Sequence, residues 1–188
     1  MVLPIVKYGH PVLRQKGARV ESITPEIRQL AADMLETMKE AHGVGLAAQQ
    51  VGRALQLTVL DVRGVEDRPS TMTVDGQPVA VAAHMPMVLL NPELTPVGEP
   101  VEGPEGCLSF PQVYADIARP ETVDVKAMNE KGEAVAFRCG GLLARAVQHE
   151  TDHLNGILFI DRMAHETRQR LKKDLRELHE RTKSEMGR

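Results

Sequence analysis

The sequence predicts an α+β fold in which small, mostly antiparallel sheets surround a central helix, with a further helix near each end of the chain. Helical periodicity is strong over Thr24–Ala41, Leu142–Leu154 and Arg168–Glu185, and β-rich segments lie between the first two. The order is helix, strands, helices, without the strict alternation of a doubly wound sheet. A length of 188 residues fits one domain spanning 1–188.

The first helix begins at a recognisable cap. Thr24 can accept a hydrogen bond from the first turn, and Pro25 suits the first helical position. Gly43 and Gly45 then end the helix and begin a glycine-rich loop that runs over 43–50. One apolar stripe is formed at helical spacing by Ile27, Leu30, Ala31, Met34, Leu35 and Met38.

Alternating, β-rich residues predict the strands. Leu55–Val62 reads as one strand, and Val88–Leu90 begins another that we expect to end at Asn91 and Pro92. Thr122–Met128 and Glu133–Cys139 flank Asn-Glu-Lys-Gly, which predicts a hairpin.

Two stretches between the strands carry weaker signals. Residues 64–87 hold polar and turn residues, and we expect a surface insertion there, either a hairpin or a long loop. The segment Thr95–Pro111 is rich in Gly and Pro and contains Cys107.

The last two helices have clear ends. Leu142–Leu154 opens after a Gly-Gly pair and closes at Asn155-Gly156. A C-terminal helix is expected within 165–188. Its narrow stripe consists of Leu171, Leu175 and Leu178, and acidic and basic residues are interleaved on its other faces.

Composition excludes several classes of protein. A net charge of −3 argues against a DNA-binding protein. No apolar run approaches the length of a membrane span, and the first residues do not resemble a secretory signal, so we expect a cytoplasmic location. Two cysteines, Cys107 and Cys139, are then expected to serve as a ligand or as core rather than as a disulfide.

The sharpest motif is His149-Glu150-Thr151-Asp152-His153, an H-E-x-x-H sequence on the predicted central helix. Residues four apart lie on one helix face, so both imidazoles can bind one divalent cation. The Glu that follows the first His can act as a base on a water at the ion. Two histidines do not complete a catalytic site, which usually has three protein ligands.

The third ligand has several candidates. A second H-E-x-x-H class would need a His where Phe159 stands, and another would need a downstream Glu, for which Glu166 and Glu177 are available in the charged C-terminal helix. Cys107 lies in the tight segment Glu-Gly-Cys-Leu-Ser, and a thiolate is a strong ligand for such an ion. Cys139 reads as a core residue.

Three segments together resemble the signatures of the peptide deformylase family, in the family's order. They are Gly-Val-Gly-Leu-Ala-Ala-Gln-Gln at 43–50, Glu-Gly-Cys-Leu-Ser at 105–109 and Gln-His-Glu-Thr-Asp-His-Leu at 148–154. The resemblance covers most of the chain except 64–87. It departs from the common pattern at Tyr114, where many relatives carry Arg, with Arg119 further along.

The resemblance implies a metal-dependent hydrolase that removes the N-formyl group from the initiator methionine of new chains and releases formate. Cys107, His149 and His153 would hold one divalent ion, with Fe(II) expected and Zn, Ni or Co possible as substitutes. Glu150 would move the proton. The Gln50 side chain and the Leu108 backbone N–H would stabilise the oxyanion.

A substrate pocket is also expected beside the motif. Leu142 and Ala146 share the helix face of the two histidines, and Val44 could close an apolar pocket suited to Met, although plain core packing explains Leu142 and Val44 equally well. Gly43 and Gly45 would let the loop approach the substrate backbone.

The resemblance further implies N-formylmethionyl nascent peptides as substrates, a monomer, and docking of the C-terminal helix near the ribosomal exit tunnel. Two alternatives remain open from the residues alone. One is an H-E-x-x-H metallopeptidase, and the other is a non-catalytic module in which the ion is structural and Cys139 could be a fourth ligand.

Overall fold

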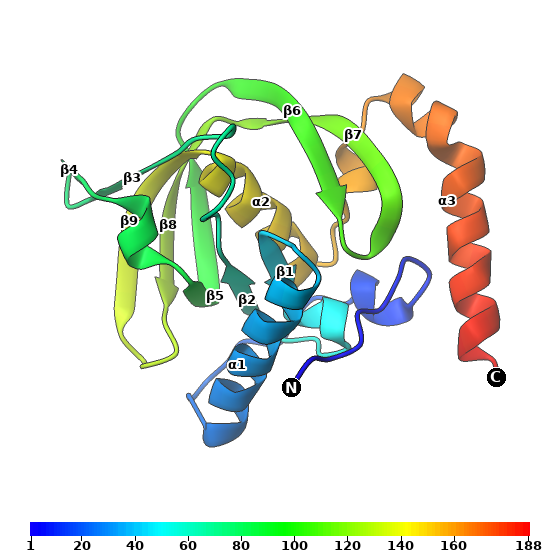
Figure 1. Ribbon diagram of the computed structural model, residues 1–188, viewed down its shortest axis with the longest axis horizontal. Helices are drawn as coiled ribbons and strands as arrows, with labels where there is room; N and C mark the ends of the chain where they lie inside the picture. The colour runs from blue at the N-terminus through cyan, green and yellow to red at the C-terminus, as the bar shows by residue number, and fades with distance from the viewer.

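The computed structural model describes residues 1–188 and has the predicted α+β architecture, with helix α2 at its centre. A seven-stranded, wholly antiparallel sheet lies on one side of α2, and a long two-stranded hairpin lies on the other (Figure 1). The sheet has the order β1-β2-β5-β8-β9-β3-β4. Its strands are β1 (Gly45–Ala47), β2 (Leu57–Leu60), β3 (Ser70–Val74), β4 (Gln77–Pro78), β5 (Met87–Pro96), β8 (Thr122–Met128) and β9 (Ala134–Gly141).

The three predicted helices are present. Helix α1 is Pro25–Glu40, and the Thr24 hydroxyl caps it by accepting a hydrogen bond from the Ile27 N–H at 3.3 Å. Helix α2 is Leu142–Leu154, as the sequence predicts. Helix α3 is His165–Met186 and begins three residues before the periodic pattern, because His165, Glu166 and Thr167 continue the helix without contributing to its apolar stripe.

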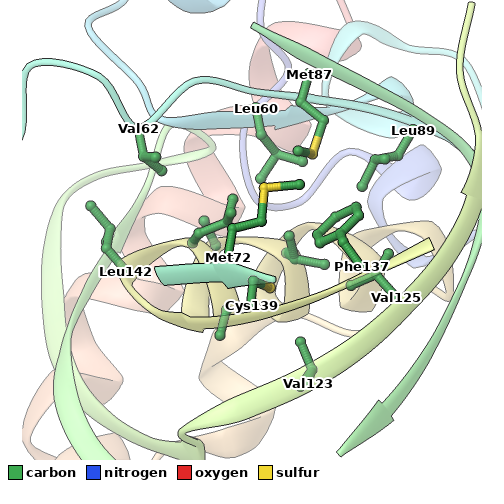
Figure 2. Packing of buried hydrophobic residues seen from close by; sticks show 14 of the residues in the cluster. Leu60, Val62, Met72, Met87, Leu89, Val123, Val125, Phe137, Cys139 and Leu142 are labelled. Atoms are coloured by element: carbon green, nitrogen blue, oxygen red, sulfur yellow. The ribbon is translucent and has the colours of Figure 1, made fainter. Parts of the chain in front are cut away.

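The main core lies between α2 and the sheet. Leu143 and Val147 of α2 are fully buried against Leu60, Leu89 and Val123 of the strands. Figure 2 shows this packing from close by, with the side chains of Met72, Met87 and Phe137 meeting in the same cluster. This packing fixes the orientation of α2, and so fixes which helix face is free to carry chemistry.

The stretch 64–87, for which the sequence leaves a hairpin or a long loop open, contains a hairpin. Its second strand, β4, is exposed, but β3 pairs with β9 inside the seven-stranded sheet. Met72 and Met85 are 5% and 7% exposed and belong to the main core. The stretch therefore supplies part of the packing around α2.

The Gly- and Pro-rich segment forms the long hairpin of β6 (Pro100–Cys107) and β7 (Phe110–Pro120), which sequence periodicity does not reveal. Proline cannot donate to a sheet ladder, but a two-stranded sheet has two free edges and tolerates it. The hairpin arches over α2 (Figure 1), and its first strand, β6, ends at Cys107.

Strands β2 and β9 differ from the predicted Leu55–Val62 and Glu133–Cys139 by one or two residues at each end, and two other predicted segments differ more. Strand β5 does not stop at Asn91-Pro92 but continues to Pro96 across a bulge, where Asn91 takes a positive φ of 52° and its side chain bonds both backbone groups of Val20. The predicted loop 43–50 is instead a short strand, β1, followed by one 3-10 turn at Ala48–Val51.

Helix α3 packs on the outer side of the hairpin (Figure 1). Leu175 and Leu178 are buried in a second core cluster with Phe110 and Phe159, and Leu171 packs against its edge. The predicted stripe therefore faces the body of the protein. None of the helices has the length and apolar content to cross a lipid bilayer.

Candidate active site

The two histidines of the motif lie one turn apart on the face of α2 that the core leaves free. Their ring centroids are 5.1 Å apart, and both side chains are largely buried, with His153 only 1% exposed. Burial lowers the pKa of His153 well below its usual value, so its ring is neutral near pH 7 and can offer a lone pair.

Cys107 meets the histidines from the end of β6. Its Sγ lies 3.3 Å from His153 Nε2. The three ligand atoms of Cys107, His149 and His153 all lie within 4.8 Å of one another. One thiolate and two imidazoles form a donor set that suits Zn²⁺, Fe²⁺ and related ions, so these residues fit the ion that the sequence implies.

A buried carboxylate orients His149. Glu105 Oε1 lies 2.8 Å from His149 Nδ1. Burial by itself would raise the pKa of Glu105, but hydrogen bonds from His149 and Arg119 outweigh it and hold the pKa at about 2. An ionised carboxylate can only accept, so Nδ1 carries a proton and Nε2 is the nitrogen that a metal would bind. Burial by itself would lower the pKa of His149, but hydrogen bonds to Cys107 and Glu105 outweigh it and raise the pKa well above its usual value, so an ion must displace a proton from Nε2.

Glu105 belongs to a buried ionic network that sequence reasoning missed. Arg119 donates to Glu105 and, through Nη1 at 2.9 Å, to Asp152. Asp152 also accepts from Arg162, and Arg145 donates to Glu105 at 2.8 Å. Arg119 was noted in the sequence without a role. The only signal for Arg145 and Asp152 is that they are charged residues among the buried positions of α2, and periodicity gives none for Glu105, which lies in β6.

Glu150 lies against β1, next to Gly45. It is 2% exposed, and a Cβ added at Gly45 would stand 2.8 Å from its Cγ and Oε2. Burial raises the pKa of Glu150 to about 7, although His149 and Arg119 act in the other direction. A carboxyl with such a pKa can both take and give a proton near neutral pH.

Gln50 lies in the 3-10 turn Ala48–Val51 and is held beside Cys107. Its Oε1 accepts from the Ala47 N–H at 2.9 Å, which directs Nε2 toward the site. Nε2 lies 3.2 Å from Ser109 Oγ and 3.6 Å from Cys107 Sγ. The amide donor is therefore next to the ligand group, as a donor to a developing oxyanion must be.

A cavity of about 450 Å³ opens over this arrangement. All five predicted substrate-binding residues line it: Gly43, Val44, Gly45, Leu142 and Ala146. The predicted Gln50, Cys107, Leu108, His149 and Glu150 line it too, whereas His153 is not among the lining residues. Sequence reasoning missed Arg68 and Arg145, and it gave no cavity role to Tyr114, which is 70% exposed at the rim.

Other candidate ligands lie elsewhere. Cys139 is buried in the main core with Val123 and Val125, and burial raises the pKa of its thiol to about 12. Glu166 and Glu177 lie on α3 and are not among the residues that gather at the histidines. The arrangement therefore has three candidate ligands and an accessible side, which is the pattern of catalytic metal sites.

Comparison with known proteins gives one consistent result. The family model described as polypeptide deformylase matches residues 2–169. The chain is 47% identical over 182 residues to a peptide deformylase of Opitutus terrae, covering 95% of this chain and 93% of that one. It is 43% identical over 178 residues to a peptide deformylase of Acinetobacter baumannii, covering 94% and 92%.

Solved structures agree with the sequence matches. The crystal structure of the Thermus thermophilus peptide deformylase superposes with a TM-score of 0.81 at 39% identity, covering 98% of this chain and 99% of that chain. The Synechococcus elongatus peptide deformylase in complex with actinonin gives 0.77 at 41% identity, covering 91% and 85%. The chain belongs to the polypeptide deformylase family.

Proposed function

We propose that this enzyme hydrolyses the formamide bond of N-formylmethionyl peptides, with the residues of the cavity in the roles given below. Water and the formyl amide are consumed, and formate and a free N-terminal methionine are released. The observation that carries the proposal is the convergence of Cys107, His149 and His153 within 4.8 Å, at a cavity that Cys107, His149 and the buried Glu150 line. Neither a peptidase nor a structural metal module has comparable support.

Cys107, His149 and His153 would hold one divalent ion, for which we propose Fe(II), with Zn, Ni or Co as substitutes that the same donors accept. Such an ion supplies Lewis-acid chemistry, polarising the formyl carbonyl and making water nucleophilic near neutral pH. Glu105 supports this arrangement by fixing the His149 ring through Nδ1.

Glu150 is proposed to move the proton. Its carboxylate takes a proton from the attacking water and its acid form gives that proton to the leaving amine nitrogen. The pKa of about 7 suits both steps, because the two forms are then nearly equally populated at neutral pH. Gln50 Nε2 and the Leu108 N–H would donate to the oxygen that gains charge on the formyl carbon.

The methionine side chain would lie along the apolar part of the cavity. Leu142 and Ala146 of α2 are 7% and 6% exposed, and Val44 is partly buried across from them. These side chains suit an unbranched thioether, whose burial contributes about 1.5–3 kcal/mol. Gly43 and Gly45 would keep the peptide backbone close to β1.

We further propose a cytoplasmic monomer whose helix α3 contacts the ribosome near the exit tunnel. Arg168, Lys172 and Arg176 of α3 line a hollow of about 400 Å³ beside Tyr8, a basic surface that would suit ribosomal RNA. Replacing the three by Glu should abolish co-sedimentation with ribosomes while leaving hydrolysis of a short peptide intact. Unchanged co-sedimentation would reject the ribosome contact, and size-exclusion chromatography with light scattering tests the monomer.

Formate release from formyl-Met-Ala-Ser tests the main proposal. Protein purified without oxygen and loaded with ferrous iron should release formate rapidly, and Glu150→Gln should lose most of that rate while keeping its iron. Glu177→Gln is the matched control, since Glu177 lies on the surface of α3. A parent enzyme with verified iron and no formate release would reject the proposed reaction.

A further inference from the structure

Arg145 is a buried charged residue that the proposed reaction does not use. It lies on α2 one turn before His149 and is only 8% exposed. An unpaired buried charge is costly, so its partners must compensate the lost hydration. Arg145 lies between helix α2 and the β6–β7 hairpin, so its partners connect these two elements.

The Arg145 guanidinium binds both strands of the β6–β7 hairpin. Nη1 donates to the Ile117 carbonyl of β7 at 2.7 Å and lies 3.4 Å from the Gly103 carbonyl of β6. Nη2 donates to the Val101 carbonyl at 2.9 Å. A planar guanidinium with several donors can join three backbone carbonyls in this way, whereas a Lys ammonium cannot match the geometry.

The same guanidinium also reaches the carboxylate that orients His149. Glu105 Oε2 accepts from Arg145 Nη1 at 2.8 Å and from Arg119 Nε at 2.6 Å, while Oε1 faces His149 Nδ1 at 2.8 Å. Arg145 therefore holds Glu105 from the side opposite His149. The Glu105 carboxylate can therefore make its hydrogen bonds to Arg145, Arg119 and His149 together in only one orientation.

Gly103 provides the space for this contact. A Cβ at position 103 would lie 2.9 Å from Arg145 Nη2, 3.0 Å from Cζ and 3.1 Å from Nε. Any larger residue would displace the guanidinium from the strand. Gly103 and Arg145 therefore form one structural unit across the gap between β6 and α2.

The metal ligands come from these same two elements. Cys107 ends β6, four residues after Gly103, and His149 and His153 lie on α2. We propose that Arg145, seated on Gly103, is a positioning residue that clamps the hairpin to α2 and so sets the distance of the Cys107 thiolate from the two imidazoles. The inference rests on the proposed metal site, and it adds a determinant of ion retention that lies outside the three ligands.

The test measures ion retention directly. Parent and Arg145→Met are loaded with Co²⁺, the thiolate-to-cobalt absorption band is recorded, and release into excess chelator is timed. Arg145→Met should release Co²⁺ roughly 10- to 100-fold faster, as loss of a partner behind the ligands typically does. Arg145→Lys, which can still reach Glu105 but not all three carbonyls, should fall between them. Arg138→Met is the matched control, because Arg138 pairs only with the exposed Asp124.

Gly103→Ala changes the same contact from strand β6, so it tests the proposal independently if Arg145→Met fails to fold. In the parent it should speed Co²⁺ release, because the added Cβ displaces the guanidinium. In the Arg145→Met background it should change little, so the two effects should not add. Thermal unfolding of each variant without metal separates loss of stability from loss of the ion.

Each outcome decides a separate question. If Arg145→Met and Gly103→Ala keep the parental cobalt band and release rate, Arg145 serves stability alone and the inference is wrong. Equal acceleration in the Arg138→Met control would overturn it as well. A parent that binds no Co²⁺ at all would instead reject the proposed metal site, independently of any measurement of formate release.

Discussion

Gly45 lies so close to Glu150 that a Cβ on residue 45 would stand 2.8 Å from the Glu150 carboxylate oxygen Oε2. The backbone of strand β1 therefore lies directly beside the Glu150 carboxyl group. Burial raises the pKa of this group to about 7. Both the position of Glu150 and its dry surroundings depend on the absence of a side chain at residue 45.

Gly45→Ala should therefore lower the rate of formate release by about 100-fold or more, since displacement of a catalytic group by about 1 Å can cost that much. The iron content should remain that of the parent, because none of the three ligands is touched. Gly187→Ala is the matched control, as a Cβ there meets only atoms at 3.7 Å. A Gly45→Ala enzyme with full kcat and KM would show that Glu150 has room to move.

The two cysteines should differ sharply in reactivity. Burial raises the pKa of Cys139 to about 12, so at pH 8 only about one molecule in ten thousand carries its thiolate. Cys107 is partly exposed and lines the cavity. Iodoacetamide at pH 8 should label Cys107 alone in metal-free protein, and neither cysteine after loading with Ni²⁺. Mass spectrometry of the peptides decides, and labelling of Cys107 at an equal rate in both forms would argue against its role as a ligand.

Local signals explain what the sequence could predict of this fold. Helix α2 has both ends marked by glycines and a periodic apolar face, and the β8–β9 hairpin has an obvious turn. The β6–β7 hairpin escaped prediction because Pro100, Pro104 and its glycines hide the alternation of a strand. That same glycine content is what the site needs, since Gly103 admits Arg145.

In the candidate site too, the residues that local signals predict differ from those that depend on contacts distant in sequence. His149, Glu150 and His153 are close in sequence and were identifiable from helical spacing alone, whereas Cys107 was singled out by family resemblance. The bond from His149 to Glu105 spans 44 residues, and no periodicity reports such a contact. Buried arginines such as Arg119 and Arg145 are harder still, because charged residues usually indicate a solvent-exposed face.

Met72 lies in the stretch 64–87, yet it is 5% exposed and packs in the main core near Cys139 and Leu142 (Figure 2). Met72→Ala should lower the free energy of unfolding by about 2–5 kcal/mol, because a buried thioether is replaced by a cavity. Urea unfolding followed by circular dichroism measures the change. Met186→Ala is the control, since Met186 is 48% exposed and should cost little. Equal small costs would mean that the Met72 side chain contributes little stability to the core.

Asp161 ties the segment after α2 back to the N-terminal region, and its contribution to stability should depend on pH. Burial by itself raises the pKa of Asp161, but hydrogen bonds from Arg14 and from the Leu158 N–H outweigh it and lower the pKa below its usual value. A carboxyl with a depressed folded-state pKa stabilises the protein above its unfolded pKa of about 4 and loses that contribution as pH falls through the folded value. The side chain is 31% exposed, so solvent screening limits the effect to on the order of 1 kcal/mol.

The difference in unfolding free energy between the parent and Asp161→Asn should therefore be constant from about pH 7 to pH 5 and shrink toward zero in stronger acid. Asp116→Asn, at an exposed position without an ion pair, should show no such trend, and a parent–variant difference that grows on acidification would mean that the Asp161 carboxylate does not stabilise the fold.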